Sequence, residues 1–123
     1  MPPVADGALT PELALAYLGE LSTDIRMAAV LGADGSLLAH SGVDEDESER
    51  LRTLVGELWE RVDAAAGDGR PPAQVEVTLP EGIVFALRDP ERSLAVVAGR
   101  YALSSLMFYD LRMVARDLAG ANA

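Results

Sequence analysis

The pattern of apolar positions predicts one long amphipathic helix over residues 44–67. Asp44 can cap its first free N–H groups, Glu47 follows three residues later as in a capping box, and Gly67 marks the end. Apolar residues recur between these ends at steps of three and four, so they share one helix face. Burying that face would contribute on the order of 10 kcal/mol gross, at ~1.5–3 kcal/mol per large side chain. The expected core residues are Leu51, Leu54, Val55, Leu58, Val62 and Ala65.

A second stripe runs along one flank of the same helix. It consists of Arg52, Val55, Gly56, Trp59, Asp63 and Ala66. The stripe contains the single tryptophan of the chain and a mid-helix glycine, which costs ~1 kcal/mol relative to alanine. Two interpretations stay open. A small residue beside a large aromatic suits the close approach of a second helix, or Trp59 lies at the edge of the core and Gly56 has no role.

Short apolar and alternating runs predict five β-strands. Residues 27–31 and 36–40 flank an Asp34-Gly35 turn and predict a hairpin, and residues 74–79, 83–87 and 94–98 predict a three-stranded meander. Continuous apolar runs are typical of strands covered on both faces, so the first, fourth and fifth strands are expected in the middle of a sheet. The second strand and the alternating third strand are expected at its edges. The simplest antiparallel order is 2-1-5-4-3.

Two further helices complete the prediction, one that begins at Pro11 after an N-cap at Thr10 and one at about 102–118. The expected fold is α+β, a three-layer α/β/α sandwich with the long helix on one face of the sheet and two helices on the other. Residues 1–9 are expected to be a flexible tail and 10–123 a single domain. In the first helix, the expected buried residues are Leu13, Ala14, Tyr17, Leu18 and Leu21, with Leu15 pointing the other way. In the last helix, they are Leu103, Leu106, Met107, Leu111, Val114 and Leu118, with Asp110 inside that arc and Phe108, Tyr109 and Met113 outside it.

Composition narrows the classes of partner. Half of the 123 residues are apolar and 24% are charged, which is typical of one globular domain. Ten arginines against twenty acidic residues leave a net charge of −10, so a nucleic-acid partner is not expected. No apolar run approaches the ~20 residues of a membrane span, and no basic residue precedes Arg26, so neither membrane insertion nor a signal peptide is expected. The lack of cysteine fits a cytoplasmic protein.

The sequence contains few of the residues that catalytic and metal-binding sites require. The chain has no cysteine, no lysine and one histidine, His40. The acidic run at residues 44–49 lacks the spacing of a calcium loop, and Ser104-Ser105 has no evident base. We therefore expect no enzyme activity, no metal and no cofactor. Arg88 and Arg92 flank a tight turn and are expected to be solvated, although an inserted arginine finger is conceivable.

The element order resembles the Roadblock/dynein light-chain family over residues 13–118. Local segments resemble its bacterial members: 27–41 with the Ala33-Asp34-Gly35 turn, 94–100, and 108–111. The lysine-free, alanine- and arginine-rich composition suggests a GC-rich genome such as that of an actinomycete, where similar Roadblock proteins are often encoded beside a small Ras-like GTPase and a sensor kinase. The resemblance implies a homodimer in which third strands pair edge to edge and long helices pack together. It also implies a non-enzymatic GTPase regulator or scaffold.

Two surfaces follow as expectations. The dimer interface would combine the flank stripe of the long helix with Val75, Val77 and Leu79 of the third strand. The GTPase would face the outward polar residues Glu49, Arg50, Thr53, Glu57, Glu60 and Arg61. The alternative function is a small-molecule sensor with a PAS-like sheet. That module needs one sheet face open to a pocket, whereas the unbroken central strands indicate that both faces are covered.

Overall fold

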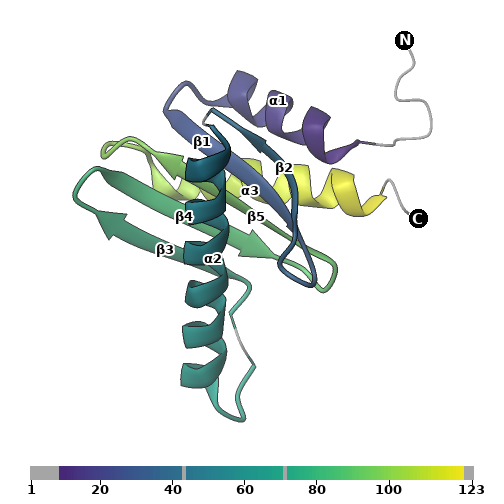
Figure 1. Cartoon of the computed structure of the whole chain (residues 1–123), viewed down its shortest axis with the longest axis vertical. Helices are drawn as coiled ribbons and strands as arrows, with labels where there is room; N and C mark the ends of the chain where they lie inside the picture. Colours follow the sequence, from purple (N-terminus) through teal and green to yellow (C-terminus); the bar gives the residue numbers. More distant parts are fainter. Residues whose placement is uncertain (1–8, 43, 71, 121–123) are drawn as a thin grey trace.

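The computed structural model describes residues 9–42, 44–70 and 72–120, and its elements follow the predicted order (Figure 1). None of the helices in this part of the chain is long and apolar enough to cross a membrane. The elements are α1 (Pro11–Leu21), β1 (Ile25–Gly32), β2 (Leu37–Ser41), α2 (Glu45–Ala66), β3 (Gln74–Leu79), β4 (Gly82–Arg88), β5 (Arg92–Ala98) and α3 (Ser104–Gly120).

The five strands form one antiparallel sheet in the order β2-β1-β5-β4-β3, which confirms the predicted topology. Small residues meet at its centre, where Ala95 of β5 lies opposite both Ala29 of β1 and Ala86 of β4. The β1–β2 hairpin turns at Asp34, whose carboxylate accepts hydrogen bonds from the backbone N–H and hydroxyl of Ser36, at 3.0 and 2.7 Å. The strands therefore run where the apolar patterns of the sequence place them.

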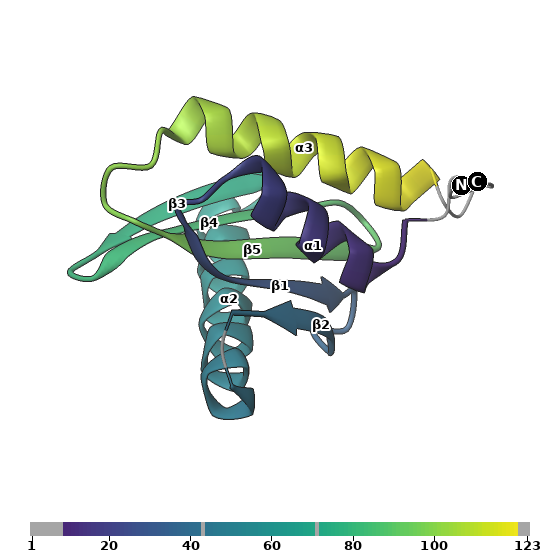
Figure 2. The ribbon, with the colours of Figure 1, turned by 90° about the horizontal axis from the view of Figure 1, so that it is seen from above.

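The helices cover both faces of the sheet, as Figure 2 shows: α2 lies on one face, and α1 and α3 lie side by side on the other. The core is accordingly in two parts. Under α1 and α3, the ring of Phe108 meets that of Phe85 edge-on, with centroids 5.4 Å apart. Under α2, a second cluster contains Ala29, Ala86 and Ala95 of the sheet. The three-layer α/β/α sandwich is confirmed, because helices lie on both faces of the sheet, whereas a PAS-like sensor would need one face without a helix.

The ends of α2 are as predicted. The Asp44 carboxylate accepts from the N–H of Glu47 at 2.9 Å, and Gly67 closes the helix at a φ of +56°. At 22 residues, the helix is about 33 Å long, taking 1.5 Å per residue. Figure 1 shows that its C-terminal turns extend beyond the sheet.

The buried face of α2 is rotated from the predicted one. Ser48, Leu51, Val55 and Trp59 are buried, whereas Leu54 and Leu58 are half-buried and Ala65 is exposed. The alanines of the sheet beneath explain the difference, because they leave a space that the indole of Trp59 fills better than a leucine would. Ser48 is tolerated in this face since its hydroxyl donates to the carbonyl of Glu45 at 2.8 Å.

The predicted faces of α1 and α3 were also wrong in part. In α1, Ala14, Leu15 and Leu18 are buried, while Leu13, Tyr17 and Leu21 are 36–51% exposed. In α3, Phe108 joins the core and Leu106 is exposed, as is Leu103 just before the helix. Both helices carry apolar arcs wider than the strip that packs on the sheet. Contacts such as Phe108 on Phe85, which are distant in sequence, decide which part is buried.

Candidate functional site

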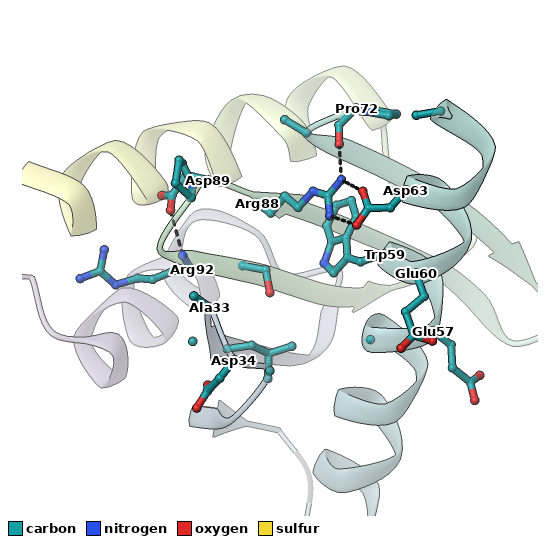
Figure 3. Close-up of a pocket in the computed structure, with 18 of the residues that line it drawn as sticks. Ala33, Asp34, Glu57, Trp59, Glu60, Asp63, Pro72, Arg88, Asp89 and Arg92 are labelled. Carbon is teal, nitrogen blue, oxygen red and sulfur yellow. Dashed lines mark hydrogen bonds and ion pairs between the residues drawn. The ribbon is translucent and has the colours of Figure 1, made fainter. Parts of the chain in front are cut away.

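A groove of about 1220 Å³ lies between one flank of α2 and the turns at one end of the sheet (Figure 3). Three parts of the chain border that flank: the β1–β2 turn at residues 32–35, the loop between α2 and β3, and the β4–β5 turn at residues 88–93. The groove is open to solvent along the helix. Its floor and walls therefore come from segments that are far apart in sequence.

The central contact of the groove joins α2 to the end of β4. The guanidinium of Arg88 lies 4.3 Å above the ring of Trp59, pairs with the Asp63 carboxylate at 2.6 Å, and donates to the carbonyl of Pro72 at 3.1 Å (Figure 3). The hydrogen bond and charge of Arg88 lower the pKa of Asp63. The expectation that Arg88 is solvated was therefore wrong. The alternation of side chains along β4 could have indicated this position, because Arg88 lies on the same α2-facing side of the strand as Ala86.

Trp59 is buried yet keeps an unused hydrogen-bond donor. Its side chain is 9% exposed, and its Nε1–H has no hydrogen-bond partner among the described residues. In Figure 3 the indole nitrogen points to the side of the groove where Ala33 lies. A buried N–H without an acceptor is destabilising by ~1–3 kcal/mol, so it calls for an explanation.

Gly56, one helical turn before Trp59, faces the same groove. A Cβ at this position would have no atom within 4 Å, and the residue has ordinary helical geometry. The packing of the single chain therefore gives no reason for a glycine that costs ~1 kcal/mol in a helix.

The turns that border the groove are fixed by short local hydrogen bonds. The hydrogen bonds from Ser36 also lower the pKa of Asp34. In the β4–β5 turn, the Asp89 carboxylate accepts from the N–H groups of Glu91 and Arg92, at 2.7 and 2.9 Å. These Asx-type contacts hold both turns in defined positions beside α2.

The residues predicted for the dimer interface lie in two places. Arg52, Gly56, Trp59, Asp63 and Ala66 line the groove, whereas Val55 is fully buried beneath it. Val75, Val77 and Leu79 of β3 are half-buried, and pairing with Ala86 and Val84 puts them on the α2 side of the sheet. Of these strand residues, Val75 packs against the cluster that contains Val55 and Trp59.

The opposite flank of α2 is apolar and incompletely covered. Leu54 and Leu58 are half-buried there, and Met27 and Val97 of the sheet are also only partly buried on the α2 side. β3 is the last strand of the sheet, with no strand on its outer side in the described chain. One helix therefore leaves part of this sheet face exposed beside a free edge.

The six residues predicted to face a GTPase are all exposed. They lie on the side of α2 away from the sheet, where Arg52 of the groove flank also reaches Glu49 at 2.9 Å. Thr53, Glu57 and Glu60 border the groove, and Glu49, Arg50, Thr53 and Glu57 border a shallower hollow of about 320 Å³. The outward face of α2 is thus continuous with the groove.

His40 and Asp110 are two further titratable residues of interest. His40 is exposed on β2, and no group of three His, Cys, Asp or Glu residues in the described chain could hold a metal ion. Asp110 lies half-exposed at the rim of the α3 core face. The groove, the polar face of α2 and the free edge of β3 are the surface features that are accessible to a binding partner.

Solved structures with the same arrangement are known. A Roadblock/LC7 domain from Streptomyces avermitilis matches 89% of this chain and 95% of that one, with a TM-score of 0.79 and 24% identity. The gliding protein MglB from Thermus thermophilus matches 89% and 88%, with a TM-score of 0.73 and 18% identity. No model of a known protein family matches the sequence.

One curated protein is similar in sequence over most of the chain. The DNA primase large subunit PriL of Methanopyrus kandleri is 33% identical over 129 aligned residues, which cover 95% of this chain. The alignment covers only 30% of PriL, so the chain spans less than a third of that relative's length.

Proposed function

Because the chain has the Roadblock/LC7 fold, we propose that it is a non-enzymatic homodimer that regulates or scaffolds a small Ras-like GTPase in bacterial signalling. The observation that carries the proposal is the combination of a free β3 edge with the solvent-facing polar side of α2. Such a partner would be met in the cytoplasm. PriL is named as a DNA primase subunit, but we do not propose a role with nucleic acid for this chain, because its net charge of −10 opposes binding to phosphates.

The proposed dimer pairs two β3 strands across a two-fold axis. An exposed edge strand is an aggregation risk unless another strand or a covering element protects it. Pairing two copies antiparallel would join the two sheets into one and would bring the half-buried Val75, Val77 and Leu79 of each copy to the junction.

The hydrogen-bond register identifies which groups would make this pairing. The N–H of Arg88 donates to the carbonyl of Ala73 at 2.8 Å, and Ala73 lies one step beyond the Gln74–Leu87 pair. Hydrogen-bonded pairs alternate in an antiparallel ladder, so Val75, Val77 and Leu79 turn their N–H groups towards β4. The N–H groups that face the free edge belong to Gln74, Glu76 and Thr78.

The second part of the proposed interface is a contact between the two α2 helices. The sequence predicted the flank with Gly56 for this contact, but Val55 and Trp59 of that stripe already pack on their own sheet. We assign it instead to the opposite flank, where Leu54 and Leu58 are half-buried. A partner helix placed there would also cover Met27 and Val97.

The proposed GTPase surface is the outward face of the two α2 helices. Its six residues carry three glutamates, two arginines and a threonine. Mixed charges of this kind set association rate and specificity more than affinity. The groove side of α2 would extend the same surface.

The test is a titration of the dimer with the Ras-like GTPase encoded nearest to its gene, loaded with GDP or with a GTP analogue. We expect binding in at least one state by calorimetry, with nucleotide hydrolysis and exchange measured in parallel. Binding without a rate change assigns a scaffold, and a rate change assigns a regulator. A folded dimer that binds the GTPase in neither state would end the proposal.

A further inference from the structure

The groove beside α2 is large enough to hold a segment of another protein. Its volume of about 1220 Å³ exceeds the ~300–1,000 Å³ that is usual for small-molecule pockets, and it is bordered by segments that local hydrogen bonds hold in place. We propose that it is a binding site for an extended, positively charged segment of the GTPase, and this rests on the function proposed above.

Gly56 supplies the first argument. Its Cα borders the groove, and a Cβ would meet no atom of the chain within 4 Å. Glycine permits the backbone of a partner to approach a helix closely, and no other residue does so equally well. Since the single chain does not use this space, a partner segment that crosses α2 at Gly56 accounts for the glycine.

Trp59 supplies the second argument, because it offers a hydrogen-bond donor to an incoming acceptor. Its indole is 9% exposed, Arg88 holds it from above, and its buried Nε1–H lacks an acceptor among the described residues. A backbone carbonyl of an extended segment is a suitable acceptor, because it needs no charge and arrives with the main chain. The segment would therefore pass beside Trp59 after it crosses Gly56.

The charged residues that line the groove indicate which side chains the bound segment would carry. Three of the four arginines that line the groove are paired with carboxylates: Arg52 with Glu49, Arg88 with Asp63, and Arg92 with Glu91 at 3.7 Å. Arg70 is the fourth. The remaining acidic residues of the lining are Asp34, Glu57, Glu60 and Asp89. The whole lining thus has five carboxylates against four arginines, and since Arg52 and Arg88 are held in close ion pairs, its unpaired carboxylates favour lysine or arginine on the incoming segment.

The first experiment replaces Gly56 with leucine in the full-length dimer. Gly19 of α1 is the matched control, because it is also an exposed helix glycine with no atom within 4 Å of a built Cβ, and it lies on the other face of the sheet. We expect Gly56→Leu to weaken GTPase binding at least tenfold without changing the dimer in sedimentation. Gly19→Leu should bind like the wild type.

A second measurement observes the groove directly. Trp59 is the only tryptophan, so protein labelled with 5-fluorotryptophan gives one ¹⁹F resonance, which reports on the indole. We expect unlabelled GTPase to shift this resonance in the wild type and not in Gly56→Leu.

The outcomes separate the two proposals. Wild-type affinity in Gly56→Leu together with an unshifted ¹⁹F signal would overturn the groove and leave the GTPase function standing. A wild-type dimer that binds no GTPase in either nucleotide state would overturn both. A shift that appears equally with a neutral control protein of similar size would also reject the groove.

Discussion

The guanidinium of Arg88 stacks on the ring of Trp59 at 4.3 Å and thereby joins β4 to the long helix. The same guanidinium is paired with Asp63 one turn further along α2. One side chain thus combines a cation–π contact, an ion pair and a hydrogen bond to the chain after the helix. It therefore connects the C-terminal half of α2 to the sheet, in addition to the packing of Trp59 and Val62.

Arg88→Ala should destabilise the fold by about 0.5–2 kcal/mol, which is the worth of the cation–π contact that it removes. The ion pair with Asp63 should add little, because solvent screens it. Urea denaturation measures the change. Asp63→Asn, which keeps the stacking, should lose much less. Equal losses in the two variants would contradict the leading role of the stacking.

Stability should also depend on the protonation of Asp63. Arg88 lowers its pKa in the folded protein, so the contribution to stability is present above the unfolded pKa of about 4 and is lost as pH falls through the folded value. The difference in unfolding free energy between wild type and Asp63→Asn isolates this group. It should shrink below about pH 4, and a difference that stays constant down to about pH 2 would contradict the linkage.

Gly56→Ala should stabilise the isolated protein by up to ~1 kcal/mol, because alanine favours the helix and its Cβ meets open space. The thermal midpoint measures the gain. Gly42→Ala is the contrasting variant. Gly42 has a φ of +86°, and a Cβ there would collide with the backbone of Arg26, so this change should destabilise. A loss of stability in Gly56→Ala would mean that the glycine serves the fold itself.

Two proline variants of β3 test the dimer. Glu76→Pro removes an N–H that faces the free edge, so it should shift the protein from dimer to monomer in sedimentation while the circular dichroism spectrum stays native. Val77→Pro removes an N–H that faces β4 and should destabilise the monomer instead. A dimer that survives Glu76→Pro unchanged would exclude pairing through β3.

Reversing two charges tests the outward face of α2. Glu57→Arg with Glu60→Arg should slow GTPase association and change its salt dependence, because these exposed groups lie outside the core and act through long-range attraction. Stopped-flow mixing measures the rate, and sedimentation should still show a dimer. An unchanged association rate would move the GTPase surface elsewhere.

The sequence was most informative where a local rule applies. Asp44 and Gly67 bound α2 because capping needs only neighbouring residues, and the alternation at 74–79 marks an edge strand because it reflects one exposed face. The topology followed from the same patterns, since continuous runs such as 83–87 can lie only where both faces are covered.

Features that depend on distant partners could not be predicted in this way. The choice between Leu58 and Trp59 for the core depends on the alanines of three strands, and both lie within one broad apolar arc. The Arg88–Asp63 pair joins residues 25 positions apart, and no periodicity connects them. The groove was missed for the same reason, because its walls come together only when α2 is laid on the sheet.

The overhang of α2, meaning its C-terminal turns beyond the sheet, affects how easily this end of the helix moves. The turns beyond the sheet have no strand beneath them, and backbone segments with few buried contacts open with a smaller free energy than the core does. Arg88 connects this end to β4 and to the carbonyl of Pro72, so it limits how far the overhang can swing away from the sheet. We therefore expect the last turns of α2 to open more readily than the turns over the sheet, and Arg88→Ala to make this opening easier.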